Sequence, residues 1–369
     1  MRHLREIDRT FLLALGGLCI FGLIVLVSAS GPLSYQKFGD SWYFFKHQLI
    51  YGFIPGIFIF SLVALFDYRK LKPLAVGALV SSVVLLVLVY IPGVGMRFGG
   101  AGRWVQLGPL SFQPSELVKI TFLIYVAAWL SARREERSKD LQNGLLPFMS
   151  ALGVIIILLV LQPNTGSMSV ITGSALLMYL VAGAPIIWFA GLGLAAVGFI
   201  AILIKLTPYR AARLLTFLHP ELDPQGIGYH INQAFLAIGS GGLFGLGYGH
   251  SRQKYLYLPE VAGDSIFAVI AEEFGFIIAV CLILAFALLI YRCIKIAQNA
   301  PDDFGRFLAT GIGSWVGLQA VFNICSMVGL MPITGVTLPF ISYGSSALIS
   351  LSIGMGIIAS ISRQSRKIV

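Results

Sequence analysis

The chain has 369 residues, of which 57% are hydrophobic and only 11% carry a charged side chain. Soluble domains carry about 25% charged residues, and the mean hydropathy here is +0.87, so the composition excludes a soluble globular fold. The net charge of +10 would suggest nucleic acid as a partner of a soluble chain. In a membrane protein it is better explained by basic cytoplasmic loops, and we expect no nucleic-acid partner.

Ten apolar runs, each close to the length of a membrane-spanning helix, follow one another along the chain. A helix needs about 20 residues to cross a bilayer at a rise of about 1.5 Å per residue. The runs lie near residues 10–30, 47–66, 73–91, 114–131, 145–161, 166–183, 186–205, 265–291, 307–329 and 343–362. The sequence therefore predicts an all-α integral membrane protein of about ten transmembrane helices, with residues 1–369 in a single polytopic domain.

Lysine and arginine predict the orientation of these runs, because cytoplasmic loops are enriched in both residues. With both termini in the cytoplasm, the inner segments hold sixteen of these residues and the short outer loops hold four. The N-terminus imitates a signal peptide, but its apolar run of about 20 residues exceeds the apolar core of a cleaved signal. We interpret it as an uncleaved first span.

One outer segment, about residues 206–263, is far longer than the other loops. Loops beyond about 12–15 residues are usually functional or disordered. Apolar residues recur within 231–238 at near-helical spacing, so we expect short interfacial or re-entrant helices. The glycine-rich run 239–249 fits neither common phosphate-loop pattern. It indicates either close packing, which we favour, or backbone N–H groups that bind a pyrophosphate.

Cysteine and histidine indicate neither a disulfide framework nor a metal site. The four cysteines have no CxxC spacing, and the five histidines form no HxxxH or HExxH pair. The run SYGSS at 342–346 resembles a serine nucleophile turn, but we assign no histidine as its base. Small residues that open a packed transmembrane helix explain this run better.

Two polar groups near the fourth span are candidates for a cavity wall. Glu116 and Lys119 are three residues apart, which places them on one helix face within pairing distance. The pair is either a structural ion pair or part of an active-site cavity. In the preceding loop, Arg103 stands beside Trp104, and a cation next to an aromatic ring suits a lipid headgroup.

Asp264 is the sharpest candidate for catalysis. It lies at the end of the long outer loop, where the eighth apolar run begins, with Glu260 before it and Glu272 and Glu273 after it. Ionisable residues at membrane depth are costly and usually functional. A carboxylate at such a boundary can serve as a general base. An aspartate before an apolar helix is also a common helix cap, so the residues alone leave capping and catalysis open.

Motifs along nearly the whole chain resemble those of the SEDS family (shape, elongation, division and sporulation), which includes FtsW, RodA and SpoVE. They are SAS at 28–30, GRW at 102–104, SFQPSELVK at 111–119, QP at 162–163, AIGSGG at 237–242, LPE at 258–260 with Asp264, and GVTLPFISYG at 335–344. Two positions depart from the family pattern. Asn164 stands where relatives commonly have aspartate, and Ala262-Gly263 precedes Asp264 where relatives commonly have His-Thr.

The resemblance implies a peptidoglycan glycosyltransferase that polymerises lipid II at the outer face of the bacterial cytoplasmic membrane. It implies as partners a class B penicillin-binding protein and other membrane proteins of the divisome or elongasome. The essential aspartate of the family falls on Asp264, and family cavity residues fall on Glu116 and Lys119. As an interpretation of the remaining charges, Glu260 positions the loop and is a candidate contact to the substrate, and Glu272 and Glu273 are buried structural partners.

The implied reaction is an inverting glycosyl transfer with Asp264 as base. The leaving pyrophosphate needs cations, and the candidates are Arg103, Lys119, Arg210 and Arg213. A divalent cation (Mg²⁺ or Mn²⁺) could assist, although the sequence contains no dedicated ligand cage. The amino-acid sequences of residues 28–30 and 333–339 are closer to those of the FtsW and SpoVE branch, which favours a role in septal division over one in elongation.

Two other classes of function stay open at this stage. Ten spans with polar residues at depth also suit a lipid II flippase, although such sites usually lie near the bilayer midplane. A scaffold that only recruits a partner synthase is the third alternative, and it would tolerate substitutions in the cavity.

Overall fold

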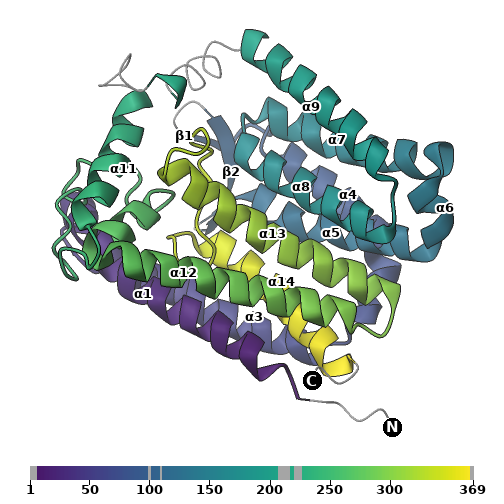
Figure 1. Ribbon diagram of the computed structural model, residues 1–369, viewed down its shortest axis with the longest axis horizontal. Helices are drawn as coiled ribbons and strands as arrows, with labels where there is room; N and C mark the ends of the chain where they lie inside the picture. Colours follow the sequence, from purple (N-terminus) through teal and green to yellow (C-terminus); the bar gives the residue numbers. More distant parts are fainter. Residues whose placement is uncertain (1–5, 99–100, 109, 207–216, 220–226, 366–369) are drawn as a thin grey trace.

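Long apolar helices run side by side through the computed structural model, which describes residues 6–98, 101–108, 110–206, 217–219 and 227–365 (Figure 1). In lipid only closed backbone hydrogen bonding is stable, and helices provide it within each segment. The α-helices are α1 (Arg9–Phe38), α2 (Tyr43–Gln48), α3 (Ile54–Leu65), α4 (Ala75–Leu88), α5 (Pro114–Ala132), α6 (Arg134–Lys139), α7 (Leu146–Leu161), α8 (Thr165–Ala182), α9 (Ile186–Leu206), α11 (Ile227–Gly241), α12 (Ile266–Gln298), α13 (Asp303–Met327) and α14 (Ser345–Gln364). Short π- and 3₁₀-helical turns join some of them at Leu49–Phe53, Tyr68–Leu74 and Leu141–Leu145.

Nine helices of the described residues are long and apolar enough to cross a membrane, and they match nine of the ten predicted runs. The remaining run, near residues 186–205, forms α9. This helix is 21 residues long, and Ile186–Phe199 is an apolar stretch of it. The all-α, multi-pass prediction is therefore confirmed.

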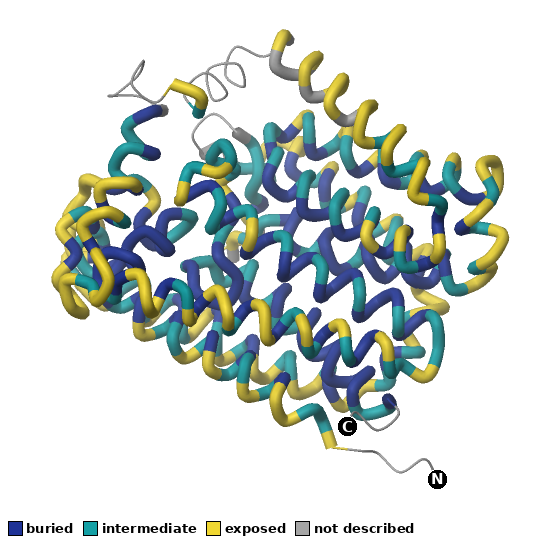
Figure 2. The backbone as a smooth tube through the Cα atoms, viewed as in Figure 1, coloured by how far each residue is buried: buried dark blue, intermediate teal, exposed yellow. Residues whose placement is uncertain are grey.

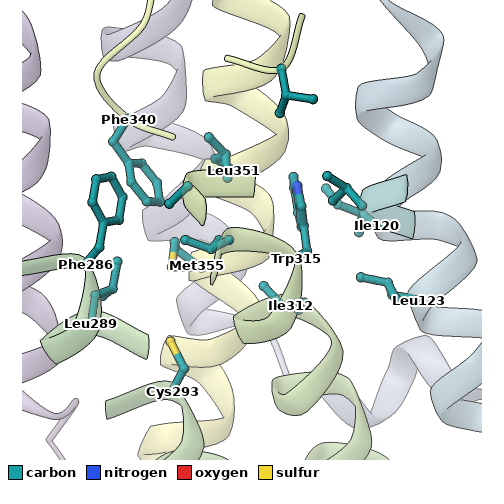
Figure 3. Close-up of a cluster of buried hydrophobic side chains, with 14 of the residues drawn as sticks. Ile120, Leu123, Phe286, Leu289, Cys293, Ile312, Trp315, Phe340, Leu351 and Met355 are labelled. Carbon is teal, nitrogen blue, oxygen red and sulfur yellow. The ribbon is translucent and has the colours of Figure 1, made fainter. Parts of the chain in front are cut away.

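The centre of the bundle consists of α5, α8, α13 and α14. In the most apolar 18-residue stretch of each of these spans half or more of the residues are buried, whereas a third or fewer are buried in the corresponding stretch of the other spans. Helix α13 contacts α5, α8, α12 and α14. Figure 2 shows the buried backbone concentrated in this centre, with exposed residues on the outer helices. Apolar side chains of these helices and of α12 fill it, among them Trp315, Met355 and Phe286 (Figure 3).

A small antiparallel sheet, which the sequence did not predict, follows α4. Its strands are β1 (Gly95–Phe98), β2 (Ala101–Leu107) and β3 (Leu110–Phe112), in the order β1-β2-β3. Gly108, with φ of 61°, lies in the turn between β2 and β3, a conformation that glycine adopts readily. The sheet leads directly into α5 and so places Arg103 above the outer end of the bundle.

Helix α12 breaks at Gly275, where φ is 76° and ψ is −177°. The glycine-rich run after α11 fills the break. Phe276 N–H donates to the Gly242 carbonyl (2.9 Å), and Leu246 N–H donates to the Glu272 carbonyl (2.9 Å). The run thus replaces hydrogen bonds that the helix loses. Its N–H groups at Leu246 and Gly247 are engaged by α12, which supports close packing over the pyrophosphate alternative.

Ion pairs join the helices at the predicted cytoplasmic end. Asp8, the N-cap of α1, binds Arg292 of α12. Asp302 caps α13 by accepting from Gly305 N–H (2.8 Å), and it binds Tyr68 (2.7 Å) and Arg69 (2.9 Å). Burial raises the pKa of Asp302, but these three donors outweigh it and hold the pKa below its usual value.

Candidate active site

Asp264 lies immediately before α12, at the predicted outer end of the bundle. The helix begins at Ile266, and its N-cap position belongs to Ser265. The cap explanation of Asp264 therefore loses support, since the cap position is one residue further on. The Asp264 side chain is half-buried, and an ideal Cβ at Gly335 would be 3.8 Å from its Oδ2.

Three consecutive carbonyl groups fix the loop that carries Asp264. The Tyr343 N–H donates to the Ala262 carbonyl (2.8 Å). The Ser342 hydroxyl donates to the Gly263 carbonyl (2.6 Å), and the Asn323 side-chain amide donates to the Asp264 carbonyl (2.7 Å). The loop is thus held by the segment between α13 and α14 and by α13 itself. Ser342 has a structural role, because its only hydroxyl proton is used in this bond.

Glu260 shapes the same loop through its backbone. Its φ of 48° is left-handed, and its carbonyl accepts from Gly263 N–H (2.8 Å) and Ser265 N–H (3.3 Å). The Glu260 side chain is exposed. The geometry agrees with the predicted role in positioning the loop, and the predicted contact with substrate stays a prediction.

The predicted pair of Glu116 and Lys119 is present and buried. Lys119 Nζ lies 2.7 Å from Glu116 Oε1, and the side chains are 2% and 7% exposed. Lys119 also donates to Gln319 Oε1 (2.9 Å) and lies over the Trp315 ring, 5.5 Å from its centroid. Glu116 Oε2 is buried, and no described residue donates a hydrogen bond to it.

The remaining predicted cations do not all gather at Asp264 in the described structure. The Arg103 guanidinium donates to the carbonyl groups of Gln162 (3.4 Å) and Pro163, so it braces the turn between α7 and α8. Arg210 and Arg213 lie outside the described residues. Asn164 occupies the position where the family commonly has aspartate. Its side-chain oxygen caps α8 by accepting a hydrogen bond from the Ser167 N–H (3.2 Å), and its side-chain amide donates to the Ser115 hydroxyl (3.0 Å).

Glu272 and Glu273 are buried, as predicted, and belong to one network. Glu273 accepts from Ser28 (2.6 Å) and pairs with Lys254 Nζ (2.8 Å). Glu272 accepts from Ser251 (2.5 Å) and from Arg252 N–H (2.8 Å). The network joins α1, the loop before Asp264 and the first half of α12. Lys254 was not predicted from the sequence, because no local pattern in the long loop signals its burial.

Two histidines near the site were also missed. His230 of α11 lies 2.5 Å from the Ser265 hydroxyl, next to Asp264. His47 of α2 lies 3.0 Å from the Tyr343 hydroxyl and 3.5 Å from that of Ser345. A histidine therefore does contact the 342–346 run. Burial raises the pKa of Tyr343 to about 12, so its hydroxyl stays protonated near neutral pH.

Within the described ranges, no group of three or more histidine, cysteine, aspartate or glutamate side chains could hold a metal ion. The described polar groups include the Asp264 carboxylate at the loop end and the buried ion pair of α5. Such an arrangement can remove a proton at Asp264.

These features define a multi-pass membrane protein with a polar site at the outer end of its helix bundle. The chain belongs to the FtsW/RodA/SpoVE family of cell cycle proteins, whose model matches residues 9–367. It is 40% identical to stage V sporulation protein E of Bacillus subtilis over 353 residues, 95% of each chain. It is 39% identical to the probable peptidoglycan glycosyltransferase FtsW of Trichlorobacter lovleyi, over 98% of this chain and 94% of the relative.

Solved structures share the fold. A chain of a peptidoglycan synthase complex aligns with a TM-score of 0.80 at 28% identity, covering 97% of this chain and 98% of that one. The rod shape determining protein RodA of Thermus thermophilus aligns with a TM-score of 0.70 at 27% identity, covering 98% of each chain.

Proposed function

We propose that this chain is a peptidoglycan glycosyltransferase that polymerises lipid II at the outer face of the bacterial cytoplasmic membrane. Relatives that cover nearly its whole length carry the name of that activity. The observation that carries the proposal is the placement of Asp264. Its carboxylate stands at the bundle mouth while the carbonyl groups of residues 262–264 are all anchored. Preorganisation of this kind favours catalysis over a merely structural role.

In this mechanism Asp264 is the general base. It accepts the proton of the acceptor's GlcNAc 4-hydroxyl while that oxygen attacks the anomeric carbon of the donor's MurNAc. The new C1–O4 bond forms with inversion, and the bond from C1 to the pyrophosphate oxygen breaks. Undecaprenyl pyrophosphate leaves with the electron pair, and Asp264 later releases its proton to water.

The buried pair of Glu116 and Lys119 supports substrate binding. A buried acceptor without a donor costs free energy, and Glu116 Oε2 receives no hydrogen bond from any described residue. A hydroxyl or amide group of the sugar would satisfy it. Lys119 would add positive charge near the leaving pyrophosphate, together with Arg103, Arg210 and Arg213.

The partner in this proposal is a class B penicillin-binding protein that crosslinks the product strand. A fold match to a chain of a peptidoglycan synthase complex supports such a pairing. High identity to FtsW proteins and to a sporulation protein favours a role in septal synthesis over elongation.

The decisive experiment replaces Asp264 by asparagine, which keeps the size of the side chain and removes the base. Purified Asp264→Asn protein should fold and yet lose polymerisation of purified lipid II by about 10²–10⁴-fold, the usual contribution of a general base. The control is Asp40→Asn, at an exposed aspartate of an outer loop that pairs with Lys46. It should keep full activity. Normal strand synthesis by Asp264→Asn would refute the proposal.

A further inference from the structure

Helix α13 carries two fully buried amides, Gln319 and Asn323, one turn apart on the face toward the site. Neither belongs to the site predicted from sequence. Together they contact Lys119, Asp264 and the irregular segment between α13 and α14. They therefore connect the buried ion pair with the backbone of the base.

Both polar atoms of the Gln319 side chain, Oε1 and Nε2, form hydrogen bonds. Its Oε1 accepts from Lys119 Nζ (2.9 Å) and from Trp315 Nε1 (2.7 Å). Its Nε2 donates to the carbonyl (3.0 Å) and the hydroxyl (3.3 Å) of Thr337. A flipped amide would place its NH₂ group against the ammonium of Lys119, so these partners determine the orientation.

Asn323 uses both protons of its amide. Its Nδ2 donates to the Asp264 carbonyl (2.7 Å) and to the Val336 carbonyl (2.7 Å). The opposite orientation would place Oδ1 against two carbonyl oxygens, so this amide is also fixed. Because Val336 and Thr337 are adjacent, the two amides hold one segment at neighbouring points.

We propose that Gln319 and Asn323 are positioning residues that hold the Asp264 loop at a set distance from Lys119. This inference rests on the proposed function of Asp264 as base. The connection runs from Lys119 to Gln319, through Val336 and Thr337 to Asn323, and so to the Asp264 backbone. Apart from the peptide bond between Val336 and Thr337, each link is a hydrogen bond of 3.0 Å or less.

The alternative is that the amides only join helices. Interhelical hydrogen bonds in membrane proteins contribute modestly to stability. A misplacement of about 1 Å at a reacting group, in contrast, costs about 10²-fold in rate. A positioning role therefore predicts an effect on kcat that exceeds the effect on folding.

The experiment measures polymerisation of purified lipid II by the full chain with Asn323→Ala and Asn323→Ser. We expect kcat of Asn323→Ala to fall by about 30–100-fold with KM within threefold. Asn323→Ser should recover part of kcat, because its hydroxyl can still donate to one carbonyl. The matched control is Ser360→Ala, which removes a partly buried hydrogen bond to the Phe66 carbonyl at the predicted cytoplasmic end and should leave kcat unchanged.

Asn323→Asp supplies a readout that a structural role would not affect. The new carboxyl group can donate to the Asp264 or Val336 carbonyl only while it is protonated, so kcat of this variant should fall with rising pH over a range where wild type keeps its activity. A pH–rate profile that matches wild type, or a kcat of Asn323→Ala within threefold of wild type, would overturn the inference. If Asn323→Ala does not fold, the kcat of Asn323→Ser and the Asn323→Asp profile decide it.

Asp264→Asn in the same assay separates the two proposals. If that variant is inactive while the Asn323 variants match wild type, only the positioning role fails. If Asp264→Asn is active, the proposed function itself fails, whatever the Asn323 variants do.

Discussion

Lys119 is a lysine almost without solvent contact, and its ammonium is satisfied by protein groups alone. It pairs with Glu116, donates a hydrogen bond to Gln319 and lies over the ring of Trp315, and its side chain is only 2% exposed. Taking two charges out of water is costly, and removing one partner of a buried pair costs about 3–5 kcal/mol. An apolar pair of similar volume is often as stable. Stability alone therefore does not explain why this chain places charge here.

A single and a double variant of this pair separate stability from function. Glu116→Gln should lower the melting temperature, because it leaves the Lys119 ammonium buried beside neutral groups. The double variant Glu116→Gln/Lys119→Met should recover most of the loss, about 3–5 kcal/mol. Polymerisation should stay low in both, since the cation and the carboxylate are gone. If activity recovered together with stability in the double variant, the pair would have no role in substrate binding or catalysis.

At the scale of elements, the break in α12 is what allows the glycine-rich run to pack against the helix that follows Asp264. Glycines at both partners permit backbone contact that any side chain would block. An ideal Cβ at Gly245 would lie 2.2 Å from the Glu273 carbonyl oxygen, and one at Gly275 would lie 2.3 Å from the Gly245 nitrogen. The position of the first half of α12, and with it Asp264, depends on this contact.

Gly245→Ala should therefore destabilise the protein and impair activity together. Overpacking costs about 1–3 kcal/mol, and the left-handed φ of 79° adds about 1–2 kcal/mol for a residue with a Cβ. The control is Gly239→Ala in α11, where a Cβ meets nothing within 4 Å. It should be neutral or stabilising by up to about 1 kcal/mol. Melting temperatures in detergent test both, and equal values would contradict the packing argument.

Some elements could be predicted from the sequence and others could not. The difference is whether a feature depends on residues close together in the sequence or on contacts between distant segments. Membrane spans follow from hydrophobic runs because every backbone group must be satisfied within its own helix. The pair of Glu116 and Lys119 follows from helical spacing. The break at Gly275 lies inside one continuous apolar run, and its cause, the run 239–249, is distant in sequence. Asn323 contacts a carbonyl 59 residues away, so no local pattern could indicate it.

Over the whole molecule, buried charge lies toward the two ends of the bundle. Glu116, Lys119 and the network of Lys254 and Glu273 lie toward the outer end. The pair of Asp8 and Arg292 lies at the inner end. Between them, apolar side chains of α5, α12, α13 and α14 pack against one another (Figure 3). Transporter sites usually lie near the bilayer midplane, so this distribution favours an enzyme over a flippase.

Oriented vesicles test this distribution directly. With labelled lipid II supplied only on the side of Asp264, the protein should form polymer. With lipid II only on the opposite side, it should form none, and the label should not cross, because buried apolar side chains pack the centre of the bundle. A flippase would move the label from either side and would tolerate Asp264→Asn. If Asp264→Asn transferred the label without forming polymer, the protein would therefore be a transporter and not a polymerase.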